Sequence, residues 1–165
     1  MVFFDTCIWI ELCGVKSPVT EKQKRQAILS SALLQKTMQS SEKIVTCKEQ
    51  LVEIISAVQK IKMDECRKTL KAEGKPGLAN IKEFRKKDEF VLAKQLCDTV
   101  LKDVKHFADI YECVYSVDEI LARIDLADIN DCIYYDYCKE NNIDFYTFDK
   151  DIINLGTTGI VHVIC

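Results

Sequence analysis

Short apolar runs alternate with longer segments of helical periodicity along this chain. The short runs predict strands at residues 2–4, 43–46, 145–148 and 160–164. The periodic segments predict helices over residues 49–71, 79–106, 117–124 and 128–141, with an earlier helical stretch opened by Ser17-Pro18 and a short helical turn at 151–155. Strands that alternate with helices predict an α/β fold, in which helices cover both faces of an open parallel sheet.

The middle of the chain departs from this alternation. Residues from about 61 to 123 contain no convincing strand, and Gly74-Lys75-Pro76-Gly77 is the clearest break in the sequence. We therefore expect a helical arm at about 61–123, inserted into a single domain that spans residues 1–165.

Charge and hydropathy narrow the class of protein. The chain has 26 acidic and 23 basic side chains, a net charge of −3, which argues against indiscriminate coating of nucleic acid but allows local basic patches. No apolar run approaches the length of a membrane span, and the first residues lack the pattern of a signal peptide. We expect a cytoplasmic protein without membrane association.

The nine cysteines fit a reducing compartment. They include no C-x-x-C pair, and their odd number argues against a disulfide framework, so we expect free, mostly buried thiols. Neither His106 nor His162 has a cysteine at the spacing of a zinc finger, which disfavours a zinc site.

Acidic residues gather at the predicted ends of strands and the starts of helices. They are Asp5, Glu53, Asp131, Asp149 and Asp151. In an open α/β sheet, sites form just outside the carboxyl ends of the strands. Carboxylates placed there repel one another unless a hard cation such as Mg²⁺ or Mn²⁺ neutralises them. The commonest work of such an ion is to activate water against a phosphodiester.

Some of these assignments have competitors. Glu49 competes with Glu53, but Glu49 suits the first helical turn, and Glu53 is flanked by apolar residues as an inward-facing acid would be. Asp128 lies one helical turn before Asp131 and competes with it for one role. The spacing of Asp131 to Thr147 and Asp149 favours Asp131, and Asp128 is an auxiliary candidate. Asp151 could instead cap the short turn that follows it.

Three stretches together resemble the PIN-domain nucleases, especially the toxin ribonucleases of the VapC type. The first is Phe4-Asp5-Thr6-Cys7-Ile8-Trp9-Ile10-Glu11, similar to the family's opening strand and following turn. The second is residues 46–54, similar to its strand and glutamate-bearing helix. The third is Asp131-Cys132-Ile133-Tyr134 with Tyr146-Thr147-Phe148-Asp149-Lys150-Asp151, similar to its acidic ending.

The resemblance implies a role for each matching residue. Asp5, Glu53, Asp131 and Asp149 would form the catalytic, metal-binding quartet for Mg²⁺ or Mn²⁺. Asp151 would be a fifth metal ligand, and Thr147 and Asp128 would be auxiliary residues beside the metal. The implied fold is PIN-like, and the implied activity is metal-dependent hydrolysis of RNA by an endoribonuclease.

The resemblance also implies partners. RNA would be the substrate, a small antitoxin would bind the enzyme, and the chain would form a homodimer. Two alternatives stay open: a nuclease for structured DNA or RNA maturation, and a PIN-fold interaction module without activity.

Two features outside the acidic residues bear on partners. The basic run at 82–87 includes Arg85, Lys86 and Lys87. These residues either form a solvent-exposed helix face or contact the RNA backbone. Tyr134, Tyr135 and Tyr137 surround one helical turn, so we expect at least one to be exposed.

Overall fold

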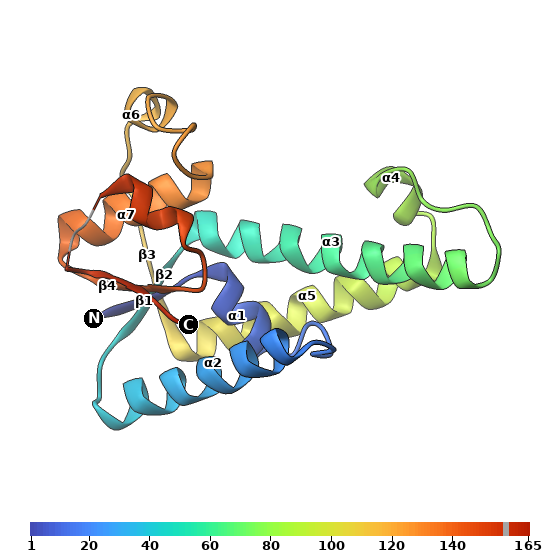
Figure 1. Cartoon of the computed structure of the whole chain (residues 1–165), viewed down its shortest axis with the longest axis horizontal. Helices are drawn as coiled ribbons and strands as arrows, with labels where there is room; N and C mark the ends of the chain where they lie inside the picture. Colours follow the sequence, from blue (N-terminus) through green and yellow to red (C-terminus); the bar gives the residue numbers. More distant parts are fainter. Residues whose placement is uncertain (157–158) are drawn as a thin grey trace.

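A five-stranded, all-parallel sheet forms the centre of the molecule in a computed structural model, which describes residues 1–156 and 159–165 (Figure 1). Its strands are β1 (Val2–Phe4), β2 (Ile44–Cys47), β3 (Ala108–Tyr111), β4 (Asp144–Thr147) and β5 (Val161–Val163). The strand order is β3-β2-β1-β4-β5. The predicted α/β fold with an open parallel sheet is therefore confirmed.

Helices cover both faces of this sheet. They are α1 (Thr6–Leu12), α2 (Glu21–Gln39), α3 (Lys48–Ala72), α4 (Ile81–Phe84), α5 (Asp88–Phe107), α6 (Val117–Leu121), α7 (Ile129–Asn141) and the 3-10 helix η1 (Asp151–Leu155). Because neighbouring strand residues point to opposite faces, Phe4 packs in the core with α1, α3 and α5, whereas Phe3 packs in the core with α7 and η1. This two-sided burial explains why β1 is a continuous apolar run and why β2 is buried along its whole length.

The central strand β1 marks the place where the strand order reverses. From β1 the chain moves to β2 on one side and later to β4 on the other. Open α/β sheets bind ligands in the crevice outside the carboxyl ends of the strands at such a point. Asp5 follows β1 directly and Asp149 lies two residues beyond β4, so the fold brings both to this crevice.

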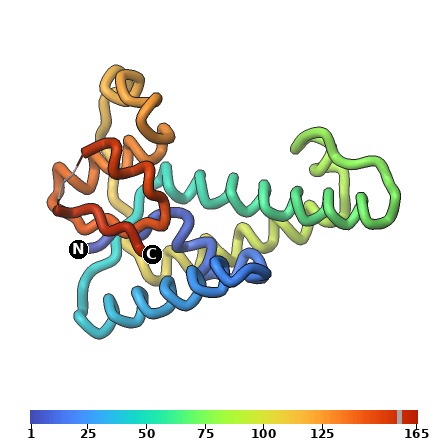
Figure 2. Tube along the Cα trace, viewed as in Figure 1, coloured from blue at the N-terminus to red at the C-terminus, as the bar shows by residue number. Residues whose placement is uncertain are grey.

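A long arm projects from the sheet, built from α3 and α5 with α4 near its far end (Figures 1 and 2). A small core holds it together: Cys66, Leu78, Phe84 and Ala93. The prediction of one helix over 79–106 is wrong, because the chain breaks at residues 85–87 between α4 and α5.

The expectation that residues 61–123 contain no strand is also wrong. The strand β3 lies in that stretch and pairs with β2. It is an edge strand, and Ala108 is its one buried residue, so it lacks the apolar run that marks the inner strands. The arm is therefore an extension of the helical crossover that connects β2 to β3.

Two local expectations also need correction. The segment after Asp5, expected as a turn, forms the helix α1. The three tyrosines of α7, Tyr134, Tyr135 and Tyr137, are all buried, because α7 packs against the sheet, η1 and α6 at once.

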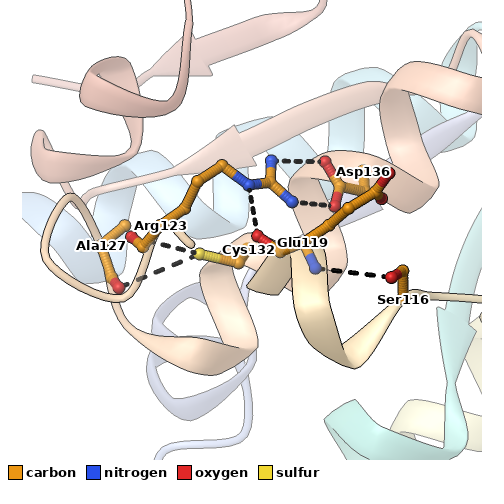
Figure 3. Close-up of polar contacts among 6 residues, drawn as sticks. All are labelled: Ser116, Glu119, Arg123, Ala127, Cys132 and Asp136. Atoms are coloured by element: carbon orange, nitrogen blue, oxygen red, sulfur yellow. Dashed lines mark hydrogen bonds and ion pairs between the residues drawn. The ribbon is translucent and has the colours of Figure 1, made fainter. Parts of the chain in front are cut away.

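An ion pair fixes the segment that leads into α7 (Figure 3). The Arg123 guanidinium donates to both carboxylate oxygens of Asp136, and its Nε donates to the Glu119 carbonyl oxygen at 3.0 Å. Both side chains of the pair are mostly shielded from solvent, which favours this two-pronged geometry. The pair ties α6 to α7 and so sets the position at which α7 begins.

Candidate active site

A cavity of about 580 Å³ lies outside the carboxyl ends of β1 and β4. Six acidic side chains line it: Asp5, Glu11, Glu53, Asp128, Asp131 and Asp149. The four acids predicted as a quartet thus reach one cavity from four places, namely the end of β1, the helix α3, the helix α7 and the loop after β4.

Asp5 is the most enclosed of these acids, with 6% of its surface exposed. The Thr147 hydroxyl donates a hydrogen bond to its Oδ2, and the Cys7 thiol donates to the same oxygen at 3.1 Å. Burial raises the pKa of Asp5, and the charge of Glu53 raises it further, while the hydrogen bond from Thr147 opposes this shift. A cation in the cavity would relieve the cost of this buried negative charge.

Glu53 is held by two hydroxyl groups. The Thr6 hydroxyl donates to Glu53 Oε2 at 2.8 Å, and the Tyr134 hydroxyl donates to the same oxygen at 2.6 Å. Burial and the nearby Glu53 carboxylate raise the pKa of Tyr134, so this phenol keeps its proton and remains a donor. Glu49, the competitor of Glu53, does not line the cavity.

The start of α3 is anchored so that Glu53 faces the cavity. The Gln50 amide donates to the Phe4 carbonyl oxygen at 2.8 Å and accepts from the Thr46 hydroxyl at 2.7 Å. These buried bonds join the first turn of α3 to the ends of β1 and β2. Glu53 lies three residues after Gln50, so it lies on the same side of the helix.

Asp131 lies in the first turn of α7 and is half-buried. Desolvation raises its pKa to about 7, with further contributions from the charges of Asp5, Asp149, Glu53 and Asp128. The charges of the other acids thus favour the protonated form of Asp131. Asp128 is exposed at the N-cap of α7 and lines the cavity beside Asp131.

The loop after β4 presents Asp149 at the mouth of the cavity. The backbone N–H of Asp149 donates to the Thr147 hydroxyl at 2.9 Å, and Asp149 Oδ1 accepts from the backbone N–H of Asp151 at 2.8 Å. Thr147 therefore connects Asp5 and Asp149. The exposed Asp151 is absent from the cavity lining, and it contacts Asp149 through its backbone.

The basic residues predicted for RNA lie elsewhere. Arg85, Lys86 and Lys87 are exposed and follow α4 near the far end of the arm (Figure 1). The cationic residue Lys16 does line the cavity, where it pairs with Glu11 at 3.0 Å.

Sequence reasoning missed several members of this site. Thr6 and Tyr134 orient Glu53. Tyr134 lies three residues after Asp131, so a helical projection places both on one face of α7. Burial raises the pKa of Cys7, which keeps it a thiol and disfavours a role as nucleophile.

The donor set of the cavity fits a hard, hydrated cation. Carboxylate oxygens are preferred ligands of Mg²⁺ and Mn²⁺. Within residues 1–156 and 159–165, no three carboxylates of this cavity have ligand atoms that all lie within 4.8 Å of one another. Mg²⁺ commonly keeps several waters and binds directly to one or two carboxylates, so this spacing fits an ion held partly through water.

Comparison with protein families identifies the family to which the chain belongs. The family model described as "PIN domain" matches residues 2–157. The chain therefore belongs to the PIN-domain family, whose members are generally nucleases, and the match supports a nuclease here. No significant match was found among curated proteins or among solved structures.

Proposed function

We propose that this protein is a metal-dependent endoribonuclease that hydrolyses RNA phosphodiester bonds with Mg²⁺ or Mn²⁺. One observation carries the proposal: Asp5, Glu53, Asp131 and Asp149 line a single cavity where the strand order reverses. Acids that raise one another's pKa at such a place cost stability, and a cation-dependent activity explains why they are there.

The four acids would hold the ion, and a bound ion would orient the attacking water and offset the charge that develops on the phosphate. Neighbouring hydroxyl groups of the chain hold two of these carboxylates in position. Thr147 fixes Asp5, and Thr6 and Tyr134 fix Glu53. Held this way, the carboxylates need little reorganisation when substrate enters.

The substrate proposal includes a second contact on the arm. Arg85, Lys86 and Lys87 would bind the RNA backbone at a distance from the cavity, because an acidic cavity repels phosphate and needs a basic surface to offset it. An RNA long enough to reach both would bind more tightly than a short one.

We further propose the toxin role, with a small antitoxin as partner, a homodimer, and a cytoplasmic location. Exposed large apolar side chains support a protein partner: Ile110, Tyr111, Val114, Tyr115, Val117, Leu121, Ile124, Leu126 and Ile129. Ile129 also lines the cavity, so a partner on this surface would adjoin it. None of the helices in the described parts of the chain is long and apolar enough to cross a membrane.

The test is cleavage of RNA by the purified chain. With Mn²⁺ or Mg²⁺, the protein should fragment RNA from its own cell extract, and EDTA should abolish the reaction. Hairpin DNA assayed in parallel distinguishes a nuclease for structured DNA. The variant that combines Asp131→Asn with Asp149→Asn is the control for contaminating nuclease. Absence of cleavage, together with partner binding that this double variant leaves unchanged, would favour an inactive interaction module.

A further inference from the structure

A second group of metal-ligand side chains lies away from the acidic cavity, at the carboxyl ends of β2 and β3. Cys47 is the last residue of β2, Glu49 lies in the first turn of α3, and Cys113 follows β3 by two residues. The two sulfur atoms and a Glu49 carboxylate oxygen all lie within 4.8 Å of one another. None of the three residues lines the acidic cavity.

The arrangement is enclosed. Cys47 is fully buried, Cys113 is 7% exposed, and Glu49 is half-buried. Across the parts of the chain that the structure describes, Glu49 takes part in no ion pair. A cation bound here would offset the charge of the partly desolvated carboxylate.

The three ligands match one class of ion. Two thiolates and a carboxylate suit the borderline-soft Zn²⁺, whereas Mg²⁺ prefers oxygen ligands. Tetrahedral zinc, with Zn–S bonds of about 2.3 Å and Zn–O bonds of about 2.0–2.2 Å, places neighbouring ligand atoms about 3.5–3.8 Å apart. The three ligand atoms lie within 4.8 Å of one another, so a small adjustment would bring them to these distances. The positive N-terminal end of α3 further offsets the negative charge of these ligands.

The geometry points to a Zn²⁺ site formed by Cys47, Glu49 and Cys113. It would join β2, the start of α3 and the segment that follows the edge strand β3. Strand β3 has a single neighbour in the sheet, and Lys43 contacts it through Asp109 and Tyr111. Zinc would secure the carboxyl ends of this strand pair and stabilise the edge of the sheet.

The experiment uses the reduced full-length chain, stripped of metal and then titrated with Zn²⁺ or Co²⁺. We expect one tightly bound Zn²⁺, a sulfur-to-cobalt charge-transfer band with Co²⁺, and a higher melting temperature with Zn²⁺. Cys47→Ser and Cys113→Ser should lose the band and the zinc-dependent rise. Two controls should keep both: Cys7→Ser, at the acidic cavity, and Cys97→Ser, in the core that Phe4 shares with α1, α3 and α5.

Because Glu49 is half-exposed, Glu49→Gln should fold even if a serine at a buried cysteine position prevents folding. Glu49→Gln should weaken Zn²⁺ binding by at least the roughly 10–100-fold that outer-shell changes cause. A band that survives in Cys47→Ser and Cys113→Ser, or that disappears in Cys7→Ser, would overturn the proposal. Unchanged zinc affinity in Glu49→Gln would also overturn it.

Discussion

The Tyr134 hydroxyl donates a hydrogen bond of 2.6 Å to Oε2 of Glu53 and so joins α7 to α3 across the candidate active site. The two helices pack on opposite faces of the sheet. The bond fixes the Glu53 carboxylate in the orientation in which it lines the cavity.

Removing this hydroxyl should destabilise the protein. Tyr134→Phe leaves the Glu53 carboxylate with one hydroxyl donor instead of two, and a hydrogen bond to a charged group contributes about 1.5–3 kcal/mol. We expect a loss near the lower end of that range in urea unfolding with EDTA present. Tyr137→Phe, also buried on α7, is the matched control. An equal loss in both variants would contradict the role given to Tyr134.

Activity should depend on the acids that line the cavity. Asp131→Asn and Asp149→Asn should each lower the RNA cleavage rate by roughly 10²–10³-fold, as for other deletions of groups that stabilise transition-state charge. Asp98→Asn provides the control, because Asp98 is an exposed acid of α5 that pairs with Lys102. If the cleavage rate falls equally in all three variants, the acids of the cavity have no special role in activity.

Stability without metal should depend on pH. The pKa of Asp131 is raised to about 7, so between about pH 4 and pH 7 the folded state binds more protons than the unfolded state. The free energy of unfolding should therefore fall as the pH rises through this window and level off above it. Asp5 shifts in the same direction. Urea unfolding in EDTA across these pH values measures the slope, which Asp131→Asn should reduce.

Mn²⁺ or Mg²⁺ should raise the melting temperature at neutral pH, because an ion that binds only the folded state stabilises it by mass action. Asp5→Asn should reduce this rise, while the metal-free variant should be as stable as the parent or more stable, since it removes a buried charge. Differential scanning fluorimetry with and without the ion tests this. A full metal response in Asp5→Asn would exclude Asp5 from the site.

Charge reversal on the arm should weaken RNA binding and leave the chemical step nearly intact. Replacing Arg85, Lys86 and Lys87 by Glu should lower the salt dependence of binding by up to about one unit of slope for each phosphate that is no longer neutralised. Single-turnover cleavage at saturating RNA separates binding from chemistry. The control reverses three exposed lysines of α5: Lys94, Lys102 and Lys105. If both triple variants bind RNA equally, the arm tip has no specific role.

The sequence predicts those parts of the fold that leave a local signal. Helices cover both faces of the inner strands β1, β2 and β4, and the apolar residues within these strands locate them to within about a residue or two. Strand β3 has no such run, because it is an edge strand with Ala108 as its one buried residue. The burial of all three tyrosines of α7 could not be predicted, because periodicity cannot show that a helix is enclosed from several sides at once.

The site follows the same logic. Acids at strand ends can be located from the sequence, and the apolar residues on either side of Glu53 favour it over Glu49. The structure brings the predicted quartet to one cavity, while the roles of these residues remain predictions. Contacts such as Tyr134–Glu53 join distant positions and leave no spacing pattern to recognise. The same is true of Cys47 and Cys113, whose proximity depends on the pairing of β2 with β3.

The position of the arm within the fold allows the arm to become shorter or longer without a change in the sheet. The helix α3 follows β2 directly, and α5 runs directly into β3. The arm therefore lies within a single crossover, and the sheet fixes both of its ends. At 1.5 Å per residue, the 25 residues of α3 extend about 37 Å. Removing matched turns from α3 and α5 would shorten the reach of the protein toward a distant ligand without altering any strand or any acid of the cavity.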